Sequence, residues 1–365
     1  MPQSDSYVES SPEEASGDQT VSTDSSVRRG IFNFIRLLAA VLVLLSHSFP
    51  LSSRGSRDDV LGSTTLGEIG VSIFFVLSGF FVYQSSMNRG FLHFIVLRIG
   101  RIIPPLILVN FATAFLLFPV CTSSTFDSLF TIDSNGPVSY FLLNSTLIFG
   151  LQAGIKDLFV DLPYPLAVNG SLWTLPIEIK LYFLLSLIAL VTKKMNSRGP
   201  FLVLFLSSYL FYFLTELQWV ENRLLPASTL NLTILFLTGS LLACFDLKWG
   251  RLKSHRAKFL AIFLIFLISF LGIDSLKPII YACLIPALTI VPVKISKLFE
   301  FFRNRDYSYG VYLWAFPVQQ LIMHLSLADN ALSLIIFSLP ASLILAAISW
   351  HLVEKRILLS IRNRL

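Results

Sequence analysis

The recurrence of long apolar segments constrains the fold of this chain more than any other feature. Stretches of roughly 16 to 22 residues with few charges recur along nearly its whole length. A helix needs about 20 such residues to cross a hydrocarbon core of about 30 Å. In addition, 54% of the residues are hydrophobic, only 14% are charged, and the mean hydropathy is +0.72. The sequence therefore predicts an integral membrane protein.

Ten apolar segments are long enough to be membrane-spanning helices. They cover residues 31–50, 66–87, 102–120, 171–192, 200–217, 229–245, 257–272, 277–292, 307–327 and 331–352. We therefore expect an all-α, polytopic bundle of about ten transmembrane helices. A further apolar stretch, 139–152, is short for a span, and we expect it to be an interfacial or re-entrant piece within a long outer segment, 121–170.

The basic residues are distributed unevenly between the two sides that these ten helices define. If residue 30 starts in the cytoplasm, 21 of the 28 Lys and Arg residues fall in cytoplasmic segments and five in outer segments. This bias follows the positive-inside rule and predicts that both termini are cytoplasmic. It also accounts for the net charge of +6 without a nucleic-acid interface. A span at 139–152 would invert the downstream topology and remove the bias.

The N-terminal segment, 1–27, is rich in Ser, Asp and Glu and nearly empty of large apolar side chains. We expect a disordered tail there, because such a segment cannot bury enough apolar surface to fold, and one transmembrane domain over 28–365. The segment lacks a basic start followed by a short apolar core, so we do not expect a cleaved signal peptide. We expect Cys121, Cys244 and Cys283 to be structural, because they are too few and too scattered for a disulfide framework or a zinc site.

An arginine and a histidine interrupt the first apolar segment, NFIRLLAAVLVLLSH. Arg36 and His47 are eleven positions apart, so on a helix they lie within roughly 20° of one face and about 16 Å apart along the axis. Ionisable side chains inside a membrane usually face a polar interior and mark a functional route. We therefore expect this face to line a passage, with Arg36 in the inner half and His47 near the outer edge. The alternative is that Arg36 reaches the inner headgroups and His47 is interfacial.

A second pair of cations lies in the segment LRIGRIIPP. Arg98 and Arg101 are three positions apart, at the predicted cytoplasmic mouth of the third span. On a helix such a pair shares one face and can clamp a phosphate, because guanidinium groups donate two parallel hydrogen bonds. The alternative is ordinary charge that sets the topology.

A carboxylate and a tyrosine lie in the segment NGSLWTLPIEIKLYFLL. Glu178 and Tyr182 share a helix face, with Trp173 at the outer interface. Glu178 is about 10 Å from the outer end of its helix, in the same half as His47. A carboxylate beside an imidazole can fix its tautomer and raise its basicity. Pairing with Lys180 is not expected, because residues two positions apart point away from each other on a helix.

In their order and spacing, these motifs resemble those of the acyltransferase type 3 membrane family. Its first-helix signature, an Arg or Lys followed by ten residues and a His, is met by NFIRLLAAVLVLLSH. Its second helix is similar to GVSIFFVLSGFFVYQSS, its Arg-x-x-Arg to LRIGRIIPPL, and its Trp-Ser-Leu-x-x-Glu block to SLWTLPIEIKLYFL. Its Ser-Tyr-x-x-Tyr-Leu segment resembles YSYGVYLWAFPVQQ, and its closing helix SWHLVEKRIL. The six matches run in order from about residue 31 to 358.

Three positions depart from the pattern of that family. Asn33 stands where many members have Asp, Ala315 where many have His, and Arg356 where a Pro often follows Glu-Lys. Without a histidine, position 315 is removed as a base. The expectation of a catalytic histidine therefore falls on His47.

The resemblance implies an O-acyltransferase of the bacterial inner membrane. Such an enzyme transfers an acyl group, usually acetyl, from cytoplasmic acyl-CoA to a hydroxyl of an extracytoplasmic or lipid-linked glycan, such as O-antigen or an exopolysaccharide. No metal and no nucleic acid is implied. The alternatives are a non-catalytic carrier that exports a glycan or acyl compound, and a glycan polymerase or ligase, which typically places its reactive residues in long outer loops.

The resemblance also implies a role for each candidate residue. His47, oriented by Glu178, would deprotonate the acceptor hydroxyl or accept the acyl group, and Arg36 would stabilise the thioester arm or the developing oxyanion. By role, the expected site residues are catalytic His47, Glu178 and Arg36, donor-binding Arg98 and Arg101, and substrate-binding Trp173, Tyr182 and Tyr309.

Overall fold

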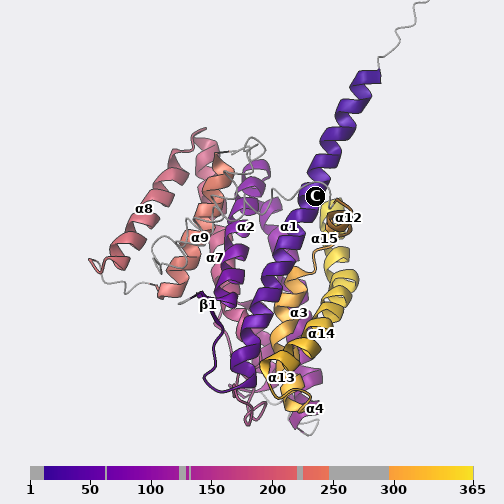
Figure 1. Cartoon of the computed structure of the whole chain (residues 1–365). Helices are drawn as coiled ribbons and strands as arrows, with labels where there is room; N and C mark the ends of the chain where they lie inside the picture. Colours follow the sequence, from indigo (N-terminus) through magenta and orange to yellow (C-terminus); the bar gives the residue numbers. More distant parts are fainter. Residues whose placement is uncertain are drawn as a thin grey trace, which may run out of the picture.

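The described part of the chain folds into a bundle of helices (Figure 1). The structure, a computed structural model, describes residues 12–61, 64–122, 129–130, 133–219, 225–245 and 296–364. Two of the predicted spans, 257–272 and 277–292, lie outside the described residues, as does Cys283. Cys121 and Cys244 are free thiols, half-buried and buried respectively.

The elements follow one another along the chain with one small β-ribbon among the described residues. The helices are α1 (Pro12–Ser52), α2 (Leu66–Asn88), α3 (Phe91–Phe111), α4 (Phe118–Thr122), α6 (Pro137–Thr146), α7 (Leu175–Lys194), α8 (Gly199–Glu216), α9 (Ala227–Cys244), α12 (Ser296–Phe302), α13 (Ser308–His324), α14 (Ala331–Ser349) and α15 (Lys355–Arg364). The π-helical turns Ala112–Leu117 and Trp350–Glu354 join α3 to α4 and α14 to α15, and the 3-10 turn Gly170–Thr174 leads into α7. Strands β1 (Asp59–Leu61) and β2 (Thr64–Thr65) pair antiparallel before α2.

Within the described residues, seven helical segments are long and apolar enough to cross a membrane. They are Arg29–Ser52, Leu66–Asn88, Phe91–Thr122, Gly170–Lys194, Gly199–Glu216, Ala227–Cys244 and Ala331–Arg364. These segments confirm the predicted all-helical, multi-pass membrane fold. Helix α13, with 17 residues, occupies the predicted span 307–327. The total of about ten spans and the side of the membrane that each terminus faces stay predictions.

Two boundaries differ from what the hydropathy pattern predicts. The helix that holds the predicted span 102–120 begins at Phe91, so Arg98 lies about two turns inside it and not at its mouth. The helical backbone of α1 begins at Pro12, inside the segment 1–27, and Figure 1 shows this part of α1 projecting beyond the bundle. The division into a tail and one domain stays a prediction.

The short apolar stretch 139–152 contains helix α6 and the turn that ends it. Helix α6 has ten residues, which span about 15 Å and so cannot cross the hydrocarbon core. It ends at Leu147, whose φ of 58° turns the chain in the left-handed conformation. This agrees with the expectation that the stretch does not form a span.

Helices α2 and α9 approach each other more closely than side chains would allow. A Cβ atom on Gly79 would lie 1.9 Å from the carbonyl oxygen of Phe236, and one on Gly239 would lie 2.0 Å from that of Val76. The hydroxyl of Ser240 donates to the carbonyl of Gly79 at 3.0 Å. Small residues and hydrogen bonds between helices are what hold membrane helices together, because lipid supplies no hydrophobic drive between them.

We expect Gly239→Ala to destabilise the folded protein by about 1–3 kcal/mol or more, because the new methyl group has no space beside the α2 backbone. The measurement is the thermal unfolding midpoint of the protein purified in detergent. Gly90→Ala is the matched control, because nothing lies within 4 Å of a Cβ at that position. A midpoint for Gly239→Ala as high as that of the control would show that the two helices can separate without cost.

The apolar part of α1 starts at the end of the bundle where the chain finishes. Gly30 of α1 packs against the backbone of Phe299 in α12, and Figure 1 shows α12 next to α15 and the C-terminus. An even number of crossings brings the chain back to the side on which it began. This agrees with the predicted topology without showing which side of the membrane that end faces.

A reporter fused after Leu365 is expected to behave as cytoplasmic, as is one inserted in 193–199, because basic residues are retained on that side. A reporter at 160 is expected to be external. The measurement is the activity of compartment-specific reporters in intact cells. An external C-terminus would mean that the number of crossings is odd.

Candidate active site

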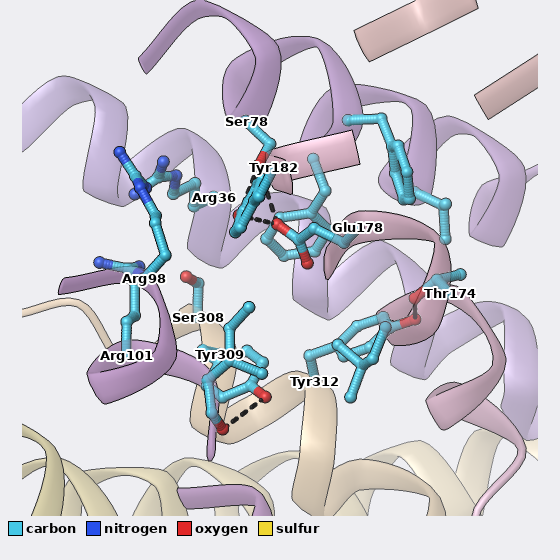
Figure 2. Close-up of a pocket in the computed structure, with 15 residues that line it drawn as sticks. Arg36, Ser78, Arg98, Arg101, Thr174, Glu178, Tyr182, Ser308, Tyr309 and Tyr312 are labelled. Carbon is cyan, nitrogen blue, oxygen red and sulfur yellow. Dashed lines mark hydrogen bonds between the residues drawn. The ribbon is translucent and has the colours of Figure 1, made fainter. Parts of the chain in front are cut away.

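A pocket among α1, α2, α3, α7 and α13 brings together most of the site residues predicted from the sequence (Figure 2). Its cavity volume is about 60 Å³. Six of the eight predicted residues line it, namely Arg36, Arg98, Arg101, Glu178, Tyr182 and Tyr309. The other two, His47 and Trp173, do not.

Each helix contributes one face to the pocket through ordinary helical spacing. Val71, Phe74 and Ser78 lie three and four positions apart on α2, and Glu178 and Tyr182 lie four apart on α7. Side chains at these spacings project from the same side of a helix. The same rule places Arg98 and Arg101 of α3 on one face, as predicted.

A buried aspartate that the sequence analysis did not single out joins two of the arginines. Asp306 lies in the connection between α12 and α13 and is only 4% exposed. Its Oδ2 atom accepts from Arg36 Nη1 at 3.2 Å and from Arg101 Nη2. Its Oδ1 atom accepts from the backbone N–H of Ser308 at 3.3 Å and from the hydroxyl of the same residue.

These cations keep the aspartate ionised. Burial raises the pKa of Asp306, but the charges of Arg101 and Arg36 and the hydrogen bond from Ser308 together lower it by more. The net effect holds the pKa of this carboxyl well below its usual range. The pocket therefore has a permanent counter-charge for two of its three arginines. In the sequence, Asp306 stands beside Arg305 in a charged connection, and nothing in its spacing distinguishes it from a solvated loop residue.

Arg98 has a different environment from its neighbour on the same face. Its guanidinium lies 5.5 Å from the ring centroids of both Phe94 and Tyr182, and its Nη2 atom donates to the carbonyl of Phe81 at 3.4 Å. No carboxylate of the described residues lies within ion-pair distance of it, whereas Arg101 is paired with Asp306. Arg98 is therefore the lining arginine available to an anionic ligand.

Glu178 forms a triangle of hydrogen bonds with two hydroxyl groups. Its carboxylate accepts from Ser78 Oγ at 2.8 Å and from the Tyr182 hydroxyl, and these two hydroxyls lie 2.8 Å apart (Figure 2). Lys180 is exposed, so it does not share the pocket, as the helix geometry predicted. Ser78 and Tyr312 are pocket residues that the sequence analysis missed, because a serine or a tyrosine in an apolar helix carries no distinctive signal.

His47 lies outside the pocket, in the other half of α1. Its ring packs against Phe316 of α13 at 5.2 Å between centroids, and its buried Nδ1 atom has no hydrogen-bond partner. Within the part of the chain that the structure describes, no hydrogen bond joins His47 to Glu178, whose partners are Ser78 and Tyr182. The structure therefore does not bring His47 and Glu178 together, and the orientation of the imidazole by Glu178 stays a prediction.

The predicted stripe along α1 is nevertheless present. Arg36 pairs with Asp306, just before α13, and His47 packs against Phe316 within α13, so both side chains face the same segment of chain. The rise of α1 between them, about 16 Å, keeps them at different depths. Residues of the turn before α7 also pack at the level of His47, since a Cβ on Gly170 would lie 2.6 Å from the Phe316 ring.

The other aromatic side chains at or near the pocket have separate roles. Tyr309 lines the pocket and donates its hydroxyl to the carbonyl of Ile102 at 3.0 Å, which ties α13 to α3. Tyr312 donates to the carbonyl of Ser171 at 2.7 Å and anchors the turn before α7. Trp173 is 44% exposed, so it faces the surroundings of the bundle and not the cavity.

Comparison with known proteins agrees with the arrangement of these motifs. A family model described as an acyltransferase domain matches residues 29–351. The chain is 28% identical over 333 residues to an O-acetyl transferase of Shigella phage Sf6, covering 90% of this chain and 95% of the phage protein. It is 24% identical over 360 residues to nodulation protein 10 of Rhizobium leguminosarum bv. viciae, covering 91% of this chain and 94% of that protein. No solved structure matches the chain.

Proposed function

Since the chain belongs to the acyltransferase type 3 family and is a membrane-bound O-acyltransferase, we propose that it moves an acetyl group from cytoplasmic acetyl-CoA to a glycan hydroxyl. The acceptor is an extracytoplasmic or lipid-linked glycan, and the location is a bacterial inner membrane. The similarity to an O-acetyl transferase supports acetyl as the group. Membership of an acyltransferase family argues against the alternative of a carrier without chemistry.

The observation that carries the proposed donor is the half-buried guanidinium of Arg98 without a carboxylate partner among the described residues. A charge that is partly removed from water and has no counter-charge is costly, so a site that keeps one is suited to an anion that arrives from outside. Coenzyme A is such an anion, because it carries three phosphate groups.

The proposed chemistry is attack of the acceptor hydroxyl on the thioester carbonyl. A base removes the hydroxyl proton as the new C–O bond forms. The C–S bond then breaks, and the leaving thiolate takes that proton from the base, so that coenzyme A is released as its thiol. Arg36 and His47 cannot both touch one carbonyl, because about 16 Å of helix rise separates them. We therefore place Arg36 along the donor arm, and His47 at the acyl end as base or as transient acyl carrier.

Glu178 is the second candidate for the base. Its carboxylate lies inside the pocket beside two hydroxyls, which suits proton transfer if the thioester stops at the level of Arg36. Tyr182 and Tyr309 would then contact the substrate as pocket walls, whereas Trp173 would meet an acceptor only at the surface of the bundle. The two candidates for the base, His47 and Glu178, predict opposite effects of the variants His47→Gln and Glu178→Gln.

We expect Arg98→Ala to weaken the binding of acetyl-CoA at least about tenfold, because a charge-assisted hydrogen bond is lost. Arg98→Lys is expected to restore part of the affinity, because a point charge lacks the planar fork. The measurement is isothermal titration calorimetry on the purified protein. Arg89→Ala, an exposed arginine at the end of α2, is the matched control. Unchanged affinity in Arg98→Ala would remove this arginine from the donor site.

We expect His47→Gln to lower acetyl transfer at least about a hundredfold with acetyl-CoA binding intact, because a general base contributes at least that much. The measurement is the O-acetyl content of surface glycans by mass spectrometry in cells with and without each variant. His324→Gln, at an exposed position, is the matched control. If His47→Gln stays active and Glu178→Gln does not, Glu178 is the base.

A further inference from the structure

We propose that Asp306 is a positioning residue of the donor pocket. It holds the guanidinium groups of Arg36 and Arg101 and thereby leaves Arg98 as the cation that receives the anionic donor. This inference rests on the proposed function, since it takes the donor to be a thioester of coenzyme A.

The contacts of Asp306 show how it acts through other residues. The carboxylate does not line the pocket, yet its Oδ2 atom binds Arg36 at 3.2 Å and also binds Arg101, and both arginines do line the pocket. Its Oδ1 atom is held by Ser308 at the start of α13. The backbone of Ser308 thus holds one oxygen of the carboxylate, and the other oxygen holds the two arginines.

The charge balance gives this arrangement a functional consequence. The pocket is lined by three arginines and by one carboxylate, that of Glu178. Three lining cations without Asp306 would compete for the same anionic donor and move toward it. With Asp306 present, Arg36 and Arg101 are neutralised at short range, where charges interact strongly away from water.

Stability alone is a weak explanation for such a pair. Replacing a buried ion pair with apolar side chains is often neutral or stabilising, because the charges lose their hydration. What the pair does determine is the position of Arg36, whose guanidinium also lies 5.0 Å from the ring of Phe81. A fixed Arg36 is preorganised along the donor arm, whereas a free one would have to be ordered during each turnover.

The test is the variant Asp306→Asn in the full-length, purified protein, with coenzyme A as the binding probe. The freed arginines add positive charge to the pocket, so we expect the affinity for coenzyme A to rise at least about threefold and to depend more steeply on salt. We expect acetyl transfer to fall at least about tenfold, because Arg36 is no longer held in place. A gain in affinity is a result that partial unfolding cannot produce.

A double variant provides a second and independent test, in which the affinity for coenzyme A is again expected to rise. Arg98→Ala is expected to lose coenzyme A binding, and adding Asp306→Asn is expected to restore much of it, because Arg101 and Arg36 become free to bind phosphate. The matched control is Glu354→Gln, since Glu354 is 2% exposed, accepts from Ser349, and has no arginine of the described residues at ion-pair distance. We expect that control to leave the affinity for coenzyme A unchanged.

If affinity does not rise in Asp306→Asn and is not restored in the double variant, the inference is overturned while the proposed function stands. If the unaltered protein binds no coenzyme A, the proposed donor itself is wrong. Should Asp306→Asn fail to fold, Asp306→Asn combined with Arg101→Gln removes the cation left unpaired. That protein is expected to bind coenzyme A and to transfer acetyl at least about tenfold more slowly, and full transfer would overturn the inference.

Discussion

The shared ion pair of Asp306 with Arg36 and Arg101 is the interaction on which the geometry of the site depends. Arginine is costly inside an apolar bundle unless it meets an opposite charge or a polar cavity. A single carboxylate meets two of them and so ties α1 and α3 to the start of α13. The third arginine, Arg98, contacts only aromatic rings and a backbone carbonyl among the described residues. It is therefore the arginine of the pocket with which an anionic ligand can form an ion pair.

The helix packing around this ion pair keeps the pocket at a defined width. Gly79 and Gly239 allow the backbones of α2 and α9 to touch, and this contact fixes the position of α2 in the bundle. Ser78, one position before Gly79, donates to Glu178 of the neighbouring helix α7. The ring of Tyr182 packs against Phe236 of α9, so the triangle of Ser78, Glu178 and Tyr182 is held by the same close helix packing, which is what a preorganised polar site requires.

The separation between the pocket and His47 has a chemical meaning. A long, narrow donor that is bound at its anionic end near Arg98 can present a distant thioester, so the phosphate site and the reacting carbon need not coincide. His47 lies against Phe316, near the turn that leads into α7, where an acceptor from the other side of the membrane would approach. Donor binding would then take place near Arg36 on α1, and the acyl transfer near His47 on the same helix.

Hydropathy and helical spacing are local properties of the chain, so they predict which segments are helices and which residues share a helix face. Apolar runs predicted the membrane helices, the eleven-residue interval predicted that Arg36 and His47 face one segment, and the four-residue interval paired Glu178 with Tyr182. The partners of Asp306 are 270 and 205 positions away in the sequence, and no spacing rule connects residues so far apart. Spacing rules also do not give the depth at which each helix lies in the bundle. That depth places His47 outside the pocket and Ser78 in its lining. These outcomes depend on how the helices pack, because only packing decides which buried charge meets which counter-charge.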